Sequence, residues 1–165
     1  MGMGMGGTST PCTGIWDQDW SDAQYYTLLT NGKGWVTDYK ASPAVPTGTP
    51  EVISVKAGRR YRLRIIGGTA SWGAKFNITG HGFDIIAVSG AASERTPAQG
   101  FVMTSGERVD VILEANQPIG NYWINVMTLL GYNSPAILHY EGAPDPLLDP
   151  SMKTPQLQVR IERDP

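Results

Sequence analysis

Three residues carry the side chains that most readily bind a transition metal: the cysteine Cys12 and the two histidines His81 and His139. An electron-transfer copper site takes two His and one Cys on a common centre, usually with a weak axial Met. A cluster of several copper ions needs many more histidines, and one imidazole without partners is no metal site. We therefore expect no metal ligand, no cofactor-binding residue and no catalytic residue in this chain.

Several motifs of known reactive sites are absent from the sequence or incomplete in it. The chain contains no Gly-x-Ser-x-Gly elbow, no P-loop and no dinucleotide-binding glycine pattern after a strand. Asp17, Asp19 and Asp22 lack the Gly and the distal Glu of a calcium loop. Met1, Met3 and Met5 are soft thioethers that can hold Cu(I). The alternative for these methionines is a disordered start, which we favour.

Two residues are candidates for covalent modification. Asn77-Ile78-Thr79 is an N-glycosylation sequon, which predicts a glycan on Asn77 if the chain passes through a secretory pathway. Cys12 has no second cysteine to pair with inside the chain. It is either a free thiol or one half of a disulfide to another domain or chain.

Composition excludes several classes of function. The 165 residues carry a net charge of −2 with both signs interspersed, so a nucleic-acid partner has no basic stripe to bind. No apolar run approaches the roughly 20 residues that span a bilayer, which predicts no membrane span. The N-terminus lacks the charged start and apolar centre of a signal peptide, and Gly6 breaks the myristoylation pattern.

Alternation of polar and apolar residues predicts strands throughout the middle of the chain. In 60–65, three arginines alternate with Tyr61, Leu63 and Ile65, so the two sets lie on opposite faces. We expect the arginine face to be solvated or to meet another domain. A binding site for an anion is the more specific alternative. Further strands are expected over 26–30, 52–56, 76–79, 83–88, 101–104, 109–113, 121–126 and 136–140.

Glycine and proline turns separate these segments, which favours an all-β antiparallel sandwich or barrel. Residues 1–24 are expected to be a flexible N-terminal segment or inter-domain linker, and 25–143 to be the folded domain. Residues 144–165 are rich in proline and are expected to form a C-terminal linker or tail. Within this tail, 156–162 alternates again and is predicted to be a strand that pairs elsewhere.

Six blocks in this middle region resemble conserved blocks of laccase-type multicopper oxidases. Together they are specific for the middle, second cupredoxin-like domain. They are LLTNGKG at 28–34, VKAGRRYRLRII at 55–66, FNITGH at 76–81, GERVDV at 106–111, ANQPIGNYWI at 115–124 and AILHYEGA at 136–143. Three positions depart from the family pattern: Thr30, Ser89 and His139.

The resemblance implies a cupredoxin-like Greek-key β-sandwich with flexible tails. In this family the blue copper lies in the last domain and the trinuclear cluster lies between the first and last. The middle domain carries no copper ligand; it spaces the outer two and walls the substrate pocket. The histidine of the GH block, here His81, is structural in the family, whereas His139 is expected to be a surface or interface residue. Copper would then belong to the parent enzyme.

Two functions remain open at this point. The first is the middle domain of an enzyme that oxidises phenols or similar donors one electron at a time and reduces O2 to water. Its partners would be other cupredoxin domains, and its location extracellular or secretory. The second is a stand-alone, non-catalytic cupredoxin module for structure or interaction in a larger assembly. In both cases the chain by itself is expected not to be catalytic.

The same alternation predicts a core between the two faces of the sandwich. Its expected members are Leu28, Tyr61, Leu63, Ile65, Phe76, Ile78, Val109, Val111, Tyr122, Ile124 and Val126.

Overall fold

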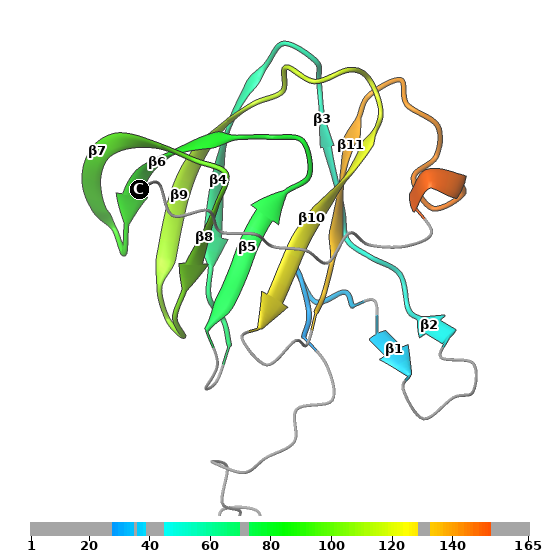
Figure 1. Ribbon diagram of the computed structural model, residues 1–165, viewed down its shortest axis with the longest axis horizontal. Helices are drawn as coiled ribbons and strands as arrows, with labels where there is room; N and C mark the ends of the chain where they lie inside the picture. The colour runs from blue at the N-terminus through cyan, green and yellow to red at the C-terminus, as the bar shows by residue number, and fades with distance from the viewer. Residues whose placement is uncertain (1–27, 35, 39–44, 70–72, 129–132, 153–165) are drawn as a thin grey trace, which may run out of the picture.

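The computed structural model describes residues 28–34, 36–38, 45–69, 73–128 and 133–152. In these residues two β-sheets pack face to face (Figure 1). A pair of short strands, β1 (Val36–Asp38) and β2 (Val45–Thr47), lies beside them. The fold is therefore an all-β, cupredoxin-like sandwich, as predicted.

The first sheet has four strands in the order β4-β9-β6-β7. They are β4 (Arg60–Ile66), β9 (Arg108–Glu114), β6 (Phe83–Val88) and β7 (Ala91–Ala98), and all pairings are antiparallel. Strand β6 shifts register between Ile85 and Ala87, where a bulge bends it. Strand β7 is almost fully exposed and contains Pro97, which an edge strand tolerates because it has an unpaired side.

The second sheet has five strands in the order β3-β11-β10-β5-β8. They are β3 (Val52–Val55), β11 (Ala136–Tyr140), β10 (Asn121–Thr128), β5 (Ala74–Ile78) and β8 (Gly100–Met103). Strands β3 and β11 are parallel, and the other pairs are antiparallel. The sandwich is thus mainly, but not wholly, antiparallel.

The core lies between the sheets, and strict alternation places it there. On β9, Val109, Val111 and Leu113 face inward and are buried. Three phenylalanines, Phe76, Phe83 and Phe101, stack or meet edge to face with ring centroids 5.2–5.9 Å apart. Such aromatic pairs add about 0.5–1.5 kcal/mol beyond the area that they bury.

The predicted core faces are confirmed, with differences in depth. Phe76, Ile78, Val109, Val111 and Ile124 are buried. Tyr61, Leu63, Ile65, Tyr122 and Val126 are half-buried against the core, and Leu28 is half-buried as well.

An apolar cleft explains the incomplete burial of β4. It has a volume of about 620 Å³ and is lined by both sheets, including Leu63, Ile65 and Val126. Its lining also includes Leu29 and Ile66, which are 53% and 69% exposed. Leu63 and Ile65 of β4 therefore pack against the core on one side and line the cleft on the other.

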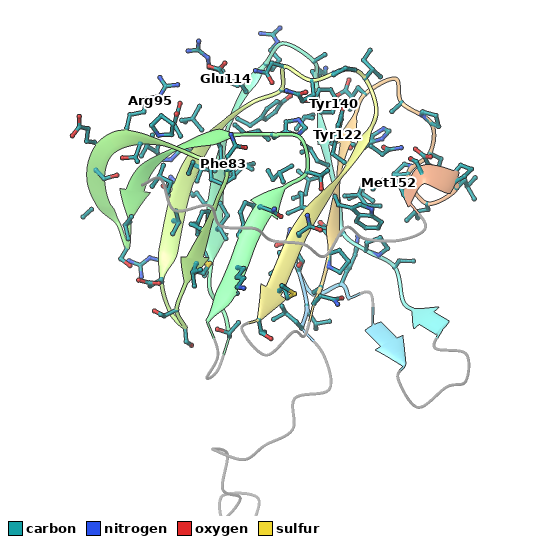
Figure 2. All side chains as sticks on the ribbon, in the orientation of Figure 1. Phe83, Arg95, Glu114, Tyr122, Tyr140 and Met152 are labelled. Carbon is teal, nitrogen blue, oxygen red and sulfur yellow. The ribbon has the colours of Figure 1, made fainter. Side chains whose placement is uncertain are left out.

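A second, smaller cluster lies on the outer face of the five-stranded sheet. Trp123 and Ile137, on adjacent strands, pack with Met152 from the 3-10 helix η2 (Pro150–Met152), and Val52 packs at the side. Figure 2 shows Met152 on η2, at the end of the coloured chain. The described part of the predicted C-terminal linker, 144–152, therefore packs against the sheet.

Most predicted strands are present within one or two residues of the expected bounds. The exceptions are β7, whose sequence is polar, and the short β1 and β2, which were not predicted. The segment predicted over 26–30 is described only from residue 28 and there forms a single bridge, Thr30 to Lys33. The strand predicted over 156–162 lies outside the described residues. Within the described part, no helix is long and apolar enough to cross a membrane.

Candidate functional site

His81 lies in a buried, hydrogen-bonded group of the sandwich. The turn after β5 places its ring inside, where it is 2% exposed. His81 Nδ1–H donates to the carbonyl of Thr79 at 2.9 Å, which leaves Nε2 to accept from the Tyr140 hydroxyl at 2.7 Å. The Tyr140 oxygen in turn accepts from the backbone N–H of Gln117 at 3.3 Å. Both imidazole nitrogens are therefore satisfied.

Aromatic rings enclose this network. His81 meets Tyr122 edge to face with ring centroids 4.7 Å apart, and Tyr122 meets Tyr140 at 5.4 Å. Tyr122 and Tyr140 lie close together near one end of the sandwich (Figure 2). Burial lowers the pKa of His81, and the Thr79 carbonyl offsets this only in part. Burial also raises the pKa of Tyr140. The arrangement favours a neutral histidine and a neutral tyrosine.

His139 lies on β11, on the outer face of the five-stranded sheet, away from the core in which His81 is buried. It follows Leu138 and precedes Tyr140, both of which point into the core. Its Nδ1 is 2.7 Å from Asn121 Oδ1. Asn121 Nδ2 donates to Asp149 Oδ2 at 2.7 Å, and this hydrogen bond is the largest cause of the lowered pKa of Asp149. His139 therefore belongs to an interface between β10, β11 and the segment before η2.

The placement of the two histidines does not fit a shared metal. Tyr140 binds His81 on the core side, while its neighbour His139 faces outward. In the described ranges, no group of three or more His, Cys, Asp or Glu side chains is arranged to hold a metal ion. Cys12 and the Met1, Met3 and Met5 run lie outside these ranges.

The predicted arginine face is exposed in this chain, and its arginines form ion pairs. Arg60, Arg62 and Arg64 are exposed on the outer side of the four-stranded sheet. Arg62 binds Asp110 at 2.5 Å, and Arg60 Nε is 2.9 Å from Glu114.

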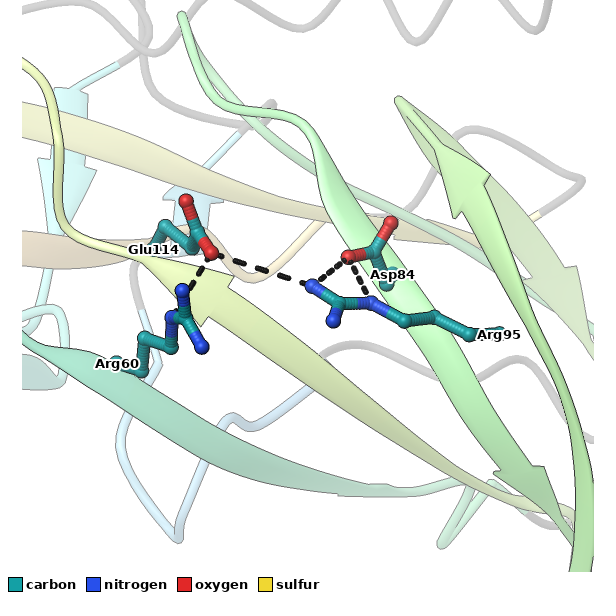
Figure 3. Close-up of polar contacts among 4 residues, drawn as sticks. All are labelled: Arg60, Asp84, Arg95 and Glu114. Atoms are coloured by element: carbon teal, nitrogen blue, oxygen red, sulfur yellow. Dashed lines mark hydrogen bonds and ion pairs between the residues drawn. The ribbon is translucent and has the colours of Figure 1, made fainter.

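These ion pairs continue across the sheet. Arg95 on β7 lies between Asp84, at 2.5 Å, and Glu114, at 3.9 Å, so that four side chains form a row from β4 to β7 (Figure 3). Such a row neutralises itself, which argues against the anion site considered above.

Asn77 faces away from the core, as its alternation with Phe76 and Ile78 predicted. It is half-buried, and its Oδ1 accepts from Asn125 Nδ2 at 2.8 Å. Its glycosylation stays a prediction.

Two of the three departures from the family pattern lie at turns. Asn31 and Gly32 have positive φ values of 51° and 78°, and Thr30 Oγ1 donates to the Ser134 carbonyl at 2.8 Å. Ser89 also has a positive φ of 49°, a conformation that costs little only for Gly, Asn or Asp. Thr30 therefore links its turn by a hydrogen bond to Ser134, just before β11. Ser89, in contrast, adopts a strained backbone conformation in its own turn.

Sequence reasoning missed the partners Tyr140 and Asn121. Both lie in blocks quoted for the resemblance, but neither alternation nor spacing indicates which histidine each will meet, because strand pairing decides it. The pairing of β10 with β11 sets Asn121 opposite His139.

Comparisons with known proteins agree with this architecture. Residues 17–143 match the multicopper oxidase family. The chain is 42% identical to Laccase-4 of Thanatephorus cucumeris over 127 residues, which are 71% of this chain and 23% of that protein. It is 34% identical to Laccase-1 of Fomitopsis schrenkii over 143 residues, 81% of this chain and 25% of that protein.

A solved structure agrees as well. The laccase from Botrytis aclada superimposes with a TM-score of 0.62 at 27% identity, covering 82% of this chain and 27% of that one. The chain spans about a quarter of the length of the relatives that it matches. The match over 127 of 165 residues, together with the sandwich itself, shows that the chain belongs to the laccase-type multicopper oxidases.

Proposed function

We propose that this chain is a copper-free middle cupredoxin domain of a laccase-like multicopper oxidase. The observation that carries the proposal is that its two histidines point apart, His81 from the turn after β5 into the core and His139 outward from β11, each already bound to a protein partner. The described residues do not fit a copper centre, so no step of the parent reaction is assigned to them.

The role that fits is that of a scaffold. A sandwich with a continuous core holds its shape, and its outer surfaces can space neighbouring domains and wall a substrate pocket. The parent enzyme would oxidise phenols or similar donors by one electron at a time and reduce O2 to water. Copper would be held by its other cupredoxin domains, and the enzyme would act in a secretory or extracellular setting.

The size of the native polypeptide tests this role. An antibody raised against the purified chain is used to probe extracts and culture medium of the source organism. A copper-containing polypeptide several times larger than 17.8 kDa, with phenol-oxidising activity, is the expected result. A native polypeptide of about 17.8 kDa without copper would refute it and favour a stand-alone, non-catalytic module.

A further inference from the structure

The cleft between the two sheets has an apolar interior. Its volume of about 620 Å³ lies within the range of roughly 300–1,000 Å³ that is typical of small-molecule sites. Leu63 and Ile65 of β4 line one wall, and side chains from β3, β5, β8 and β10 line the other. Among the described lining residues, Phe76 is the only aromatic one and most others on the two walls are aliphatic. Such a lining suits the aliphatic part of a ligand, because a polar group buried there would lack a partner.

The cleft reaches the surface beside β4. Leu29 and Ile66 line it and are exposed, so they mark its rim. Strand β4 is the first strand in the order β4-β9-β6-β7 and therefore an edge strand. No further strand of that sheet separates the outward-facing Arg62 and Arg64 from the cleft, and both belong to its lining.

The charged residues at this rim have one sign. Arg62 and Arg64 are the only charged residues among the described ones that line the cleft. Asp110 Oδ2 is 2.5 Å from Arg62 Nη2 but 3.9 Å from Arg64 Nε, so Arg62 forms the stronger ion pair with this carboxylate. The Arg64 side chain is 70% exposed. One positive charge beside the cleft is therefore weakly neutralised.

Arg64 also differs from the arginines of the ion-pair row. In that row, Arg60 and Arg95 share Glu114, and Arg95 binds Asp84 (Figure 3). Arg64 is not part of the row, so the neutralisation that argues against an anion site there does not extend to the rim of the cleft.

We propose that the cleft binds an aliphatic chain with an anionic head group, such as a free medium-chain fatty acid. The chain lies between the sheets against Leu63, Ile65 and Val126, and the carboxylate binds the Arg64 guanidinium at the rim. Burial of the chain supplies most of the affinity, whereas the charge-assisted hydrogen bond selects an anionic head. The inference does not rest on the scaffold role proposed above.

Calorimetric titration of the purified full chain with decanoate tests the proposal. We expect saturable binding of one decanoate per chain. Octanoate should bind about tenfold more weakly, since it buries two fewer CH2 groups.

Arg64→Gln tests the head-group contact. It should weaken decanoate binding by about threefold to fivefold, as expected for the loss of an exposed ion pair. Arg60→Gln is the matched control, because Arg60 lies on the same strand and is similarly exposed but does not line the cleft. It should leave decanoate binding unchanged. Binding of 1-decanol, which has the same chain but no charge, should be the same in Arg64→Gln as in the unmodified chain.

Val126→Phe tests the position of the aliphatic chain. Val126 is half-buried and lines the cleft, so the larger side chain should fill part of it and weaken decanoate and 1-decanol alike. Near-ultraviolet circular dichroism verifies that this variant is folded.

Two results would overturn the inference. The first is the absence of saturable decanoate binding to the unmodified chain. The second is an equal loss of decanoate affinity in Arg64→Gln and Arg60→Gln, which would mean that the fatty acid responds only to the overall charge of the arginine face.

Discussion

The two sheets of this molecule use polar side chains in opposite ways. At one end of the sandwich, His81 and Tyr140 are buried and linked by hydrogen bonds. On the outer face of the four-stranded sheet, Arg60, Arg95 and Glu114 form an exposed row of ion pairs. In the buried group, both imidazole nitrogens of His81 have hydrogen-bond partners. The side chains of the ion-pair row are exposed, so water and salt can reach them.

The two groups should differ in how much stability is lost when a hydrogen-bond or ion-pair partner is removed. A buried group that loses its partner keeps its desolvation cost, about 1–3 kcal/mol. An exposed charge that loses its partner returns to water, so such pairs contribute only about 0–1 kcal/mol. We therefore expect stability to depend on the buried network and the core, and the ion-pair face to be tolerant of change.

The largest effect is expected in the core beside Tyr140. Leu138 is fully buried, and Leu138→Ala should lower the free energy of unfolding by about 2–5 kcal/mol, because it removes apolar contacts and leaves a cavity. Urea denaturation measures this change. The control is Leu148→Ala at an exposed site, which should be close to neutral, and equal losses would show that this end of the sandwich is loosely packed.

A smaller loss is expected for Tyr140→Phe. This change leaves His81 Nε2 and the Gln117 N–H without their partner, at a cost of about 1–3 kcal/mol in the free energy of unfolding. Tyr61→Phe is the matched control, because the Tyr61 hydroxyl accepts from the backbone N–H of Lys56 at an exposed site. If both variants lose the same stability, the contrast between buried and exposed groups fails.

The pH dependence of stability should come from the buried region. The pKa of His81 is below 6.5 in the folded protein because of burial, so the unfolded chain binds the proton more tightly. Its contribution to stability is present above about pH 6.5 and is lost as the pH falls toward the folded pKa. Denaturation curves between pH 7 and pH 5 should show this fall. His81→Gln should reduce this fall, and a fall of unchanged size in His81→Gln would contradict the assignment.

The smallest effect is expected on the ion-pair row. Arg95→Ala breaks two contacts, to Asp84 and Glu114, and should cost about 0–1 kcal/mol. The cost should shrink in 1 M NaCl, because salt screens exposed charges. Thermal unfolding at low and high salt measures both. A loss above 2 kcal/mol that salt does not change would mean that this face is buried against something.

These contrasts show what the sequence could and could not predict. Alternation predicted the inward faces of β4, β5, β9 and β10, because a strand next to a core must place every second side chain on it. It could not predict that Leu63 borders a cleft, since that depends on how far apart the sheets lie. Strand β7 was missed because an exposed edge strand carries no apolar alternation.

For the histidines, too, some features could be predicted from the sequence and others depend on the three-dimensional arrangement. The count of His and Cys leads to the expectation that this chain builds no multicopper centre, and that expectation stays a prediction. Alternation with Leu138 and Tyr140 also predicted the outward face of His139, which the structure confirms. The partners of the two histidines, Tyr140 for His81 and Asn121 for His139, followed only from contacts distant in the sequence, and the pattern within a single strand does not encode these contacts.

Copper binding by the chain alone tests the central claim most directly. The purified full chain is incubated with excess Cu(II), and separately with Cu(I) under reducing conditions, passed through a desalting column, and measured for copper per chain and for phenol oxidation. The account predicts no stoichiometric copper, no blue absorbance and no oxidation. Stoichiometric copper together with phenol oxidation by this chain alone would contradict it.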